Sequence, residues 1–90
     1  MTIDERSSAP RARADVTLQR VGREAILHDG RNGQAHVINA TAAQLWELCD
    51  GRPLDELVAA FGAVYGRPPE TVAEDVRRTL ASFEALGLLA

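Results

Sequence analysis

The spacing of apolar residues changes near Thr41, and this change most constrains how the chain of 90 residues can fold. Before this point, the apolar residues Val16, Leu18 and those at 25–27 form short runs typical of half-buried β-strands. After it, apolar residues recur at steps of three and four, the period of amphipathic helices. The sequence therefore predicts strands in the first half of the chain and helices in the second.

Three strands are expected before the change. The first runs from Val16 to about Arg20, the second covers residues 25–27, and the third covers residues 35–39. The segment 29–33 between the second and third strands reads Asp-Gly-Arg-Asn-Gly, and Gly and Asn adopt the positive φ of tight turns at little steric cost. This segment predicts a hairpin.

Three helices are expected after the change. Thr41 is placed to cap the first, and Gln44, three residues on, would complete a capping box. Proline suits the first turn of a helix, and residues 53 and 68–69 are prolines. Glycine suits the left-handed backbone conformation that ends many helices, and residues 51, 66 and 87 are glycines. The expected apolar stripes are Ala42, Leu45, Trp46 and Cys49; Leu54, Leu57, Val58, Phe61, Val64 and Tyr65; and Val72, Val76, Leu80, Phe83 and Leu86, with Leu88 and Leu89 packing back on the core.

Length and composition predict one domain. Ninety residues supply a single modest core, and an apolar fraction of 46% with 26% charged residues is that of a globular chain. Residues 1–14 lack an apolar period, so we expect a flexible tail followed by a domain over residues 15–90. The single cysteine forms no internal disulfide, and no apolar run approaches a membrane span, so we expect a cytoplasmic protein.

The predicted fold class is α+β: a winged-helix-like domain with a three-stranded antiparallel sheet followed by three α-helices. Such a small sheet has two edge strands. An edge presents backbone N–H and C=O groups that another extended chain can pair with, so the fold favours peptide binding by strand addition.

Residues suited to catalysis are scarce. Cys49 falls within an apolar helix stripe, where a cysteine is normally buried and inert. His28 and His36 flank the expected hairpin and could face each other, but two histidines without a cysteine or a placed carboxylate do not predict a zinc site. The glycine pair at 30 and 33 lacks the spacing and lysine of a phosphate loop. The sequence predicts no enzyme activity, no metal and no cofactor.

Several segments together resemble the PqqD family. Residues 26–61, ILHDGRNGQAHVINATAAQLWELCDGRPLDELVAAF, contain an acidic-Gly turn between two strands, then an Asn-x-Thr-Ala helix start at residues 39–42 and Leu-Cys-Asp-Gly at residues 48–51. Residues 72–89, VAEDVRRTLASFEALGLL, are similar to the family's last helix and its closing Gly-Leu. The resemblance extends from about Val16 to Ala90.

This resemblance implies a recognition element for ribosomally synthesised, post-translationally modified peptides (RiPPs). A leader peptide would pair with the third strand and fill a cleft beside the third helix. The partner would be a modifying enzyme such as a radical SAM protein or a leader peptidase. The Leu-Cys-Asp-Gly motif is closer to proteins of pyrroloquinoline quinone (PQQ) assembly, and Trp46 to lasso-peptide relatives. Family members often carry an aromatic residue in the third strand, where this chain has Gln34, Ala35 and His36. The implied peptide-binding residues are Gln34, Ala35, His36, Val37, Ile38, Val76, Arg77, Leu80 and Phe83. The alternative for Val76, Leu80 and Phe83 is a place in the core, since they belong to the apolar stripe of the third helix.

Two other functions fit the same order of elements. A winged-helix DNA-binding domain would place the third helix in a groove, but the net charge is −3 and that helix carries four acids against Arg77 and Arg78, which disfavours nucleic acid and anionic membranes alike. A structural subunit that forms a homodimer through its strand edge is the second alternative.

Overall fold

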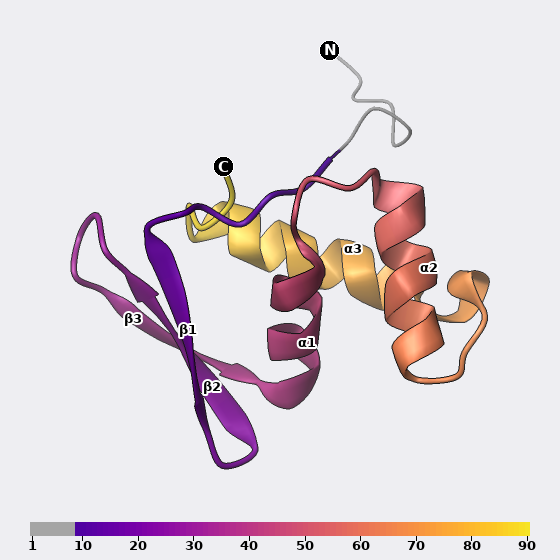
Figure 1. Ribbon diagram of the computed structural model, residues 1–90, viewed down its shortest axis with the longest axis horizontal. Helices are drawn as coiled ribbons and strands as arrows, with labels where there is room; N and C mark the ends of the chain where they lie inside the picture. Colours follow the sequence, from indigo (N-terminus) through magenta and orange to yellow (C-terminus); the bar gives the residue numbers. More distant parts are fainter. Residues whose placement is uncertain (1–8) are drawn as a thin grey trace.

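The computed structural model describes residues 9–90 and has the predicted order of elements. Three antiparallel strands form one sheet in the order β1-β2-β3, and three helices follow (Figure 1). The fold class and the hairpin at residues 29–33 are thereby confirmed. The elements are β1 (Val16–Val21), β2 (Glu24–Asp29), β3 (Ala35–Asn39), α1 (Ala40–Leu48), α2 (Leu54–Val64) and α3 (Pro69–Ala85).

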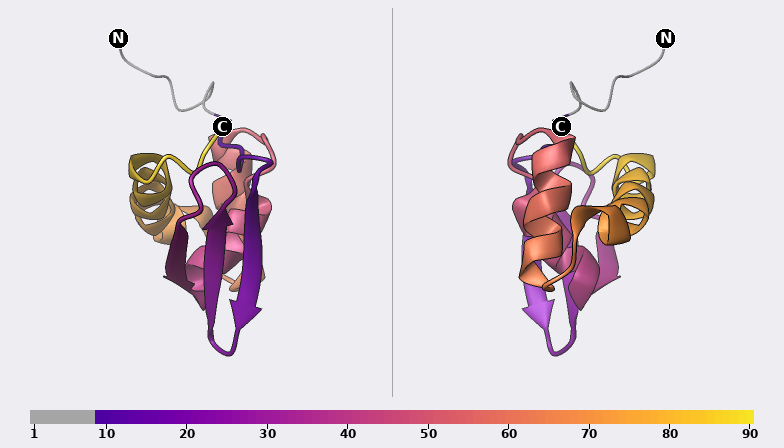
Figure 2. Two further views of the ribbon diagram at one scale, coloured as in Figure 1. Left: turned by 90° about the vertical axis from the view of Figure 1, so that its left-hand side faces the viewer. Right: turned by 90° about the vertical axis from the view of Figure 1, so that its right-hand side faces the viewer.

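The helices cover one face of the sheet. Figure 2 (left) looks onto the open face, with α1 and α2 behind the sheet and α3 beside β3. Side chains alternate accordingly: Ala25 and Leu27 of β2 are fully buried on the helix side, whereas Val37 of β3 points to the open side and is 66% exposed. The β3 edge therefore lies next to α3, and the β1 edge lies away from it.

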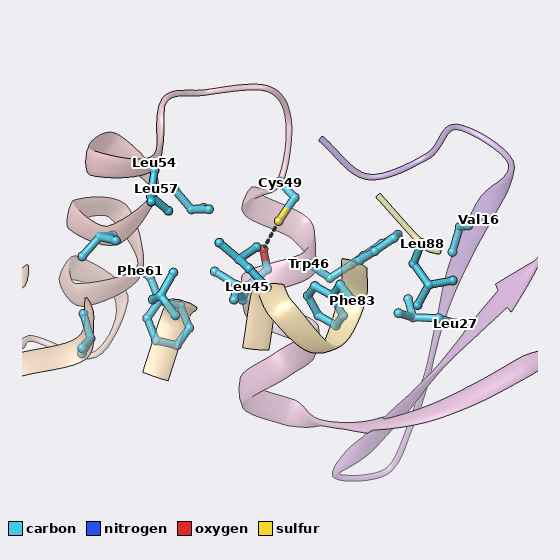
Figure 3. Close-up of a cluster of buried hydrophobic side chains, with 14 residues drawn as sticks. Val16, Leu27, Leu45, Trp46, Cys49, Leu54, Leu57, Phe61, Phe83 and Leu88 are labelled. Carbon is cyan, nitrogen blue, oxygen red and sulfur yellow. Dashed lines mark hydrogen bonds between the residues drawn. The ribbon is translucent and has the colours of Figure 1, made fainter. Parts of the chain in front are cut away.

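The core lies between the sheet and the three helices (Figure 3). Trp46 of α1 and Phe83 of α3 meet edge to face, with ring centroids 5.2 Å apart and planes at 85°. This geometry is the favourable one for an aromatic pair, and it fixes α3 against α1. The buried residues around this pair are Val16, Leu27, Leu45, Cys49, Leu54, Leu57, Val58, Phe61, Val72, Val76, Leu80 and Leu88.

The cap of the first helix lies two residues earlier than expected. Asn39, not Thr41, is its N-cap, since the Asn39 Oδ1 accepts a hydrogen bond from the Ala42 N–H at 2.7 Å. The backbone of Asn39 is extended, with φ −80° and ψ 171°, as a cap at the end of a strand requires. The expected capping role of Thr41 was therefore wrong, because β3 runs directly into α1 and leaves Thr41 inside the first turn.

Three residues of the expected apolar stripes are exposed instead of buried. Val64 and Tyr65 at the end of α2 are 51% and 43% exposed, and Leu86 after α3 is 45% exposed. The helical period identifies the side of a helix that these residues share, but it does not reveal where the neighbouring elements end. Val64 and Tyr65 lie at the turn into α3, while Leu86 borders a groove beside β3.

Residues 10–13, which the sequence assigned to a flexible tail, form backbone hydrogen bonds with the loop after α1 and with the last residues of the chain. The Ala12 N–H donates to the Cys49 carbonyl at 2.9 Å, and the Ala90 N–H donates to the Arg11 carbonyl at 2.7 Å. These bonds hold the segment between the α1–α2 loop and the end of the chain. Residues 1–8 of the expected tail lie outside the described residues.

None of the helices within residues 9–90 has both the length and the apolar character needed to span a bilayer.

Candidate functional site: the β3 edge and its groove

The outer edge of β3 carries backbone groups that do not bond to β2. The Asp29 N–H donates to the Gln34 carbonyl at 2.8 Å, and hydrogen-bonded pairs alternate with non-bonded pairs along an antiparallel ladder. Every second residue from Gln34 onward therefore bonds to β2. Ala35, Val37 and Asn39 turn their N–H groups to the edge, which no further strand covers among residues 9–90.

A groove lies between this edge and α3. It encloses about 310 Å³ and has an apolar floor formed by Ile38, Phe83 and Leu86. Phe83 is almost fully buried and so contributes a ring held fixed by the core, whereas the half-exposed Leu86 is free to adjust to a ligand. The complete lining is Val37, Ile38, Asn39, Ala42, Arg78, Thr79, Ser82, Phe83 and Leu86.

The helix wall of the groove is polar. The hydroxyls of Thr79 and Ser82 donate to the carbonyls one turn earlier in α3, at 2.9 and 3.3 Å, and each oxygen keeps a lone pair that can accept a further bond. Arg78 contacts the carboxylates of Asp75 at 3.4 Å and Glu74 at 4.0 Å, with 69% of its side chain exposed. These exposed ion pairs are weak, so the guanidinium can be recruited by an incoming carboxylate.

The structure places the nine predicted peptide-binding residues in three surroundings. Val37, Ile38 and Phe83 line the groove, and Ala35 and His36 lie on β3 beside it, with Gln34 just before the strand. Val76 and Leu80 are buried in the core, and Arg77 lines hollows on the far side of α3. The groove residues that the sequence did not predict are Asn39, Ala42, Arg78, Thr79, Ser82 and Leu86, although Arg78, Ser82 and Leu86 have the four-residue spacing of one helix face.

The two histidines do not face each other. The partner of His28 on β3 is Ala35, and that of His36 on β2 is Leu27. The His28 Nε2 lies 2.7 Å from the Gln19 Oε1 on the open face, while the His36 Nε2 is buried and has no hydrogen-bond partner among the described residues. Within that part of the chain no cluster of three or more metal-ligating side chains occurs.

Cys49 is placed as a core residue. Its thiol donates to the Leu45 carbonyl at 3.3 Å and is 4% exposed. Burial raises the pKa of the Cys49 thiol to about 12, so the thiolate that nucleophilic chemistry requires is scarce at neutral pH.

A buried ion pair holds the hairpin that leads into β3. The Arg13 guanidinium donates to both carboxylate oxygens of Asp29, at 3.0 and 3.1 Å, and to the Gly87 carbonyl at 2.7 Å. The hydrogen bonds from Arg13 hold the pKa of the Asp29 carboxyl below its ordinary value. This contact ties the end of β2, where the hairpin into β3 begins, to the turn that follows α3.

Comparison with known proteins gives a family and a structural relative. The model of the family described as Coenzyme PQQ synthesis protein D (PqqD) matches residues 24–89. The structure described as "TbiB1 in Complex with the TbiA(beta) Leader Peptide" is similar, with a TM-score of 0.71 and 25% sequence identity over 88% of this chain and 93% of that chain. No curated protein matches the chain. The fold described above is thus shared with a protein that was solved with a leader peptide bound.

Proposed function

Because this chain belongs to the PqqD family, we propose that it is a non-catalytic recognition protein that binds the leader of a ribosomally made precursor peptide. The leader adds a fourth strand to the sheet at the edge of β3. The observation that carries the proposal is the uncovered edge of a sheet beside an apolar groove, in a fold shared with the leader-bound TbiB1.

In strand addition, backbone hydrogen bonds supply affinity and side-chain contacts supply selectivity. The edge-facing groups of Ala35, Val37 and Asn39 bond to the leader backbone and supply affinity that hardly depends on leader sequence. Side chains on paired strands point to the same face as their partners, so the leader residues opposite His36 and Ile38 enter the groove. Two apolar leader side chains, two positions apart, fit this floor.

Selectivity for charge comes from Arg78 in this proposal. Arg77 was the residue implied by the resemblance, but Arg78 lines the groove, whereas Arg77 lines hollows on the far side of the same helix. An acidic leader residue near the Asn39 end of the groove would pair with Arg78 in competition with Glu74 and Asp75. Arg78→Glu is then expected to weaken leader binding several-fold, and the matched variant Arg77→Glu to leave it within about twofold.

The consequence of leader binding is that the precursor peptide is brought to its modifying enzyme. A leader held on β3 keeps the rest of the precursor near the enzyme that modifies it, and this local concentration raises the rate without any bond being broken by this chain. The partner enzyme is of the class of radical SAM proteins or leader peptidases, in PQQ-type or lasso-type biosynthesis. The recognition protein itself needs no cofactor.

The test is an NMR titration of the full ¹⁵N-labelled chain with a synthetic leader of the precursor peptide encoded beside its gene. Saturable shifts are expected for the backbone amides of Ala35, Val37 and Asn39, and for Arg78 to Leu86 on the groove side of α3. A leader with the same composition in scrambled order serves as the control for non-specific contact.

Two results would count against the proposal. Chemical-shift changes confined to other surfaces would exclude strand addition at β3. A molecular mass that rises with protein concentration and does not fall when the leader is added would favour pairing of β3 with a second copy of the chain.

A further inference from the structure

The helix α3 has two open sides. Groove residues Arg78, Ser82 and Leu86 recur every four residues on the side facing β3. A second stripe runs along the whole helix on the opposite side, since residues three or four apart share one helix face. From its first to its last member it spans 14 steps of 1.5 Å, or about 21 Å. Its members are Glu70, Ala73, Arg77, Ala81 and Glu84.

Two hollows lie along this second stripe. One of about 570 Å³ lies against the start of α2 and the first half of α3, and one of about 390 Å³ lies against the two ends of the described chain and the second half of α3. Leu54 and Arg77 line both hollows, so the two lie next to each other along α3. We call this surface the second groove, and its further lining residues are Ala9, Pro10, Asp55, Val58, Pro69, Leu80, Leu89 and Ala90.

The second groove combines an apolar floor with an acidic rim. Leu54, Val58 and Leu80 are buried at its base, and the alanines of the stripe leave space above them. Its rim carries the carboxylates of Asp55, Glu70 and Glu84 against the single guanidinium of Arg77. A partner that fits this surface has an apolar stripe flanked by Lys or Arg, because opposite charges at the rim of an interface steer and orient the partner.

We infer that the second groove docks a basic amphipathic helix of the enzyme that modifies the leader-bound precursor. This inference rests on the proposed function and names where its enzyme partner binds. A groove about 21 Å long accommodates about four turns of helix, and binding of a helix by its apolar face is a common mode of recognition.

The position of the second groove permits simultaneous binding. The leader-binding groove and the second groove lie on opposite sides of α3, and Arg77 and Arg78, adjacent in sequence, point to different ones. The core stripe Val76, Leu80 and Phe83 lies between them. A leader on β3 therefore leaves the enzyme site open, as a delivery protein requires.

The probe is a synthetic 18-residue helical peptide with Leu at positions i, i+3, i+4 and i+7 and Lys on both flanks of that stripe. Its control replaces every Lys with Glu. In an NMR titration of the full chain, the Lys peptide is expected to shift the amides of Ala73, Arg77, Ala81 and Glu84 with little change at Val37. The Glu peptide is expected to bind at least about tenfold more weakly.

Two exposed alanines of α3 form a matched pair of variants. Ala81→Arg places a bulky cation in the second groove and is expected to raise the Kd of the Lys peptide about tenfold or more. Ala85→Arg adds the same side chain one turn later, where it lines neither groove, and is expected to change the Kd by less than about twofold. Circular dichroism checks that both variants are folded.

The result that overturns the inference is equal binding of the Lys peptide by the Ala81→Arg and Ala85→Arg proteins, or displacement of the Lys peptide by saturating leader. Either outcome leaves the proposed function intact if the leader still shifts the β3 amides. If the leader shifts no β3 amide, the proposed function fails, whichever surface the Lys peptide binds.

Discussion

Replacing Val37 by proline tests whether a leader pairs with β3. Proline has no N–H, and the Val37 N–H points to the open edge rather than to β2, so the variant keeps the ladder of the folded sheet. The leader carbonyl that pairs there would lose its donor in a partly buried groove. Such a loss costs about 1–3 kcal/mol, which corresponds to a rise in the leader Kd of about 5- to 150-fold.

Two further variants separate the backbone effect from other causes. Val37→Ala keeps the N–H and shortens a side chain that is 66% exposed, so its Kd for the leader is expected to stay within about threefold of the parent. His36→Pro removes an N–H that faces β2 and is expected to lower the melting temperature strongly. Calorimetric titration gives the Kd, and thermal unfolding gives the stability.

The reasoning is refuted if the Val37→Pro protein is folded and binds the leader with the Kd of the parent. The leader would then not pair with β3 at Val37, and the strand-addition mode would have to be abandoned.

Asn39→Ala is expected to lower the free energy of unfolding by about 1 kcal/mol through loss of the helix cap, whereas Thr41→Ala should stay within about 0.5 kcal/mol, as measured by urea unfolding; equal losses would contradict the assignment of the cap. The Arg13 contact lowers the pKa of Asp29 from 3.8, so it stabilises the fold above that ordinary value, and this contribution disappears as pH falls through the lowered pKa. In unfolding experiments from pH 7 to pH 2, Asp29→Asn should be less stable than the parent at pH 7, with the gap in the free energy of unfolding narrowing as pH falls below about 4; a gap that does not narrow would contradict the linkage. Because the Cys49 thiol has a pKa of about 12, iodoacetamide at pH 8 should alkylate it far more slowly in the folded chain than in urea, and equal rates would show that the thiol is accessible.

The sequence by itself determined the order and type of the elements. These depend on local chemistry: the period of apolar residues distinguishes strand from helix, and glycine stops a helix where the backbone turns left-handed. Gly51, Gly66 and Gly87 do have positive φ, at 94°, 63° and 72°. The resemblance to the PqqD family also came from local motifs in a fixed order, and the family match over residues 24–89 confirms it.

Only the tertiary structure decided which side chains border the groove beside β3. Successive helix residues are rotated by about 100°, so Arg77 and Arg78 face different grooves, and no local signal says which of them lies beside β3. Likewise, the helical period allowed Val76 and Leu80 to lie either in the core or beside the cleft, and only the packing of α3 shows that both are buried. The pairing of residues 10–13 with the end of the chain joins segments more than 70 residues apart, as in the bond from Arg13 to Gly87, and periodicity within a short window carries no information about such contacts.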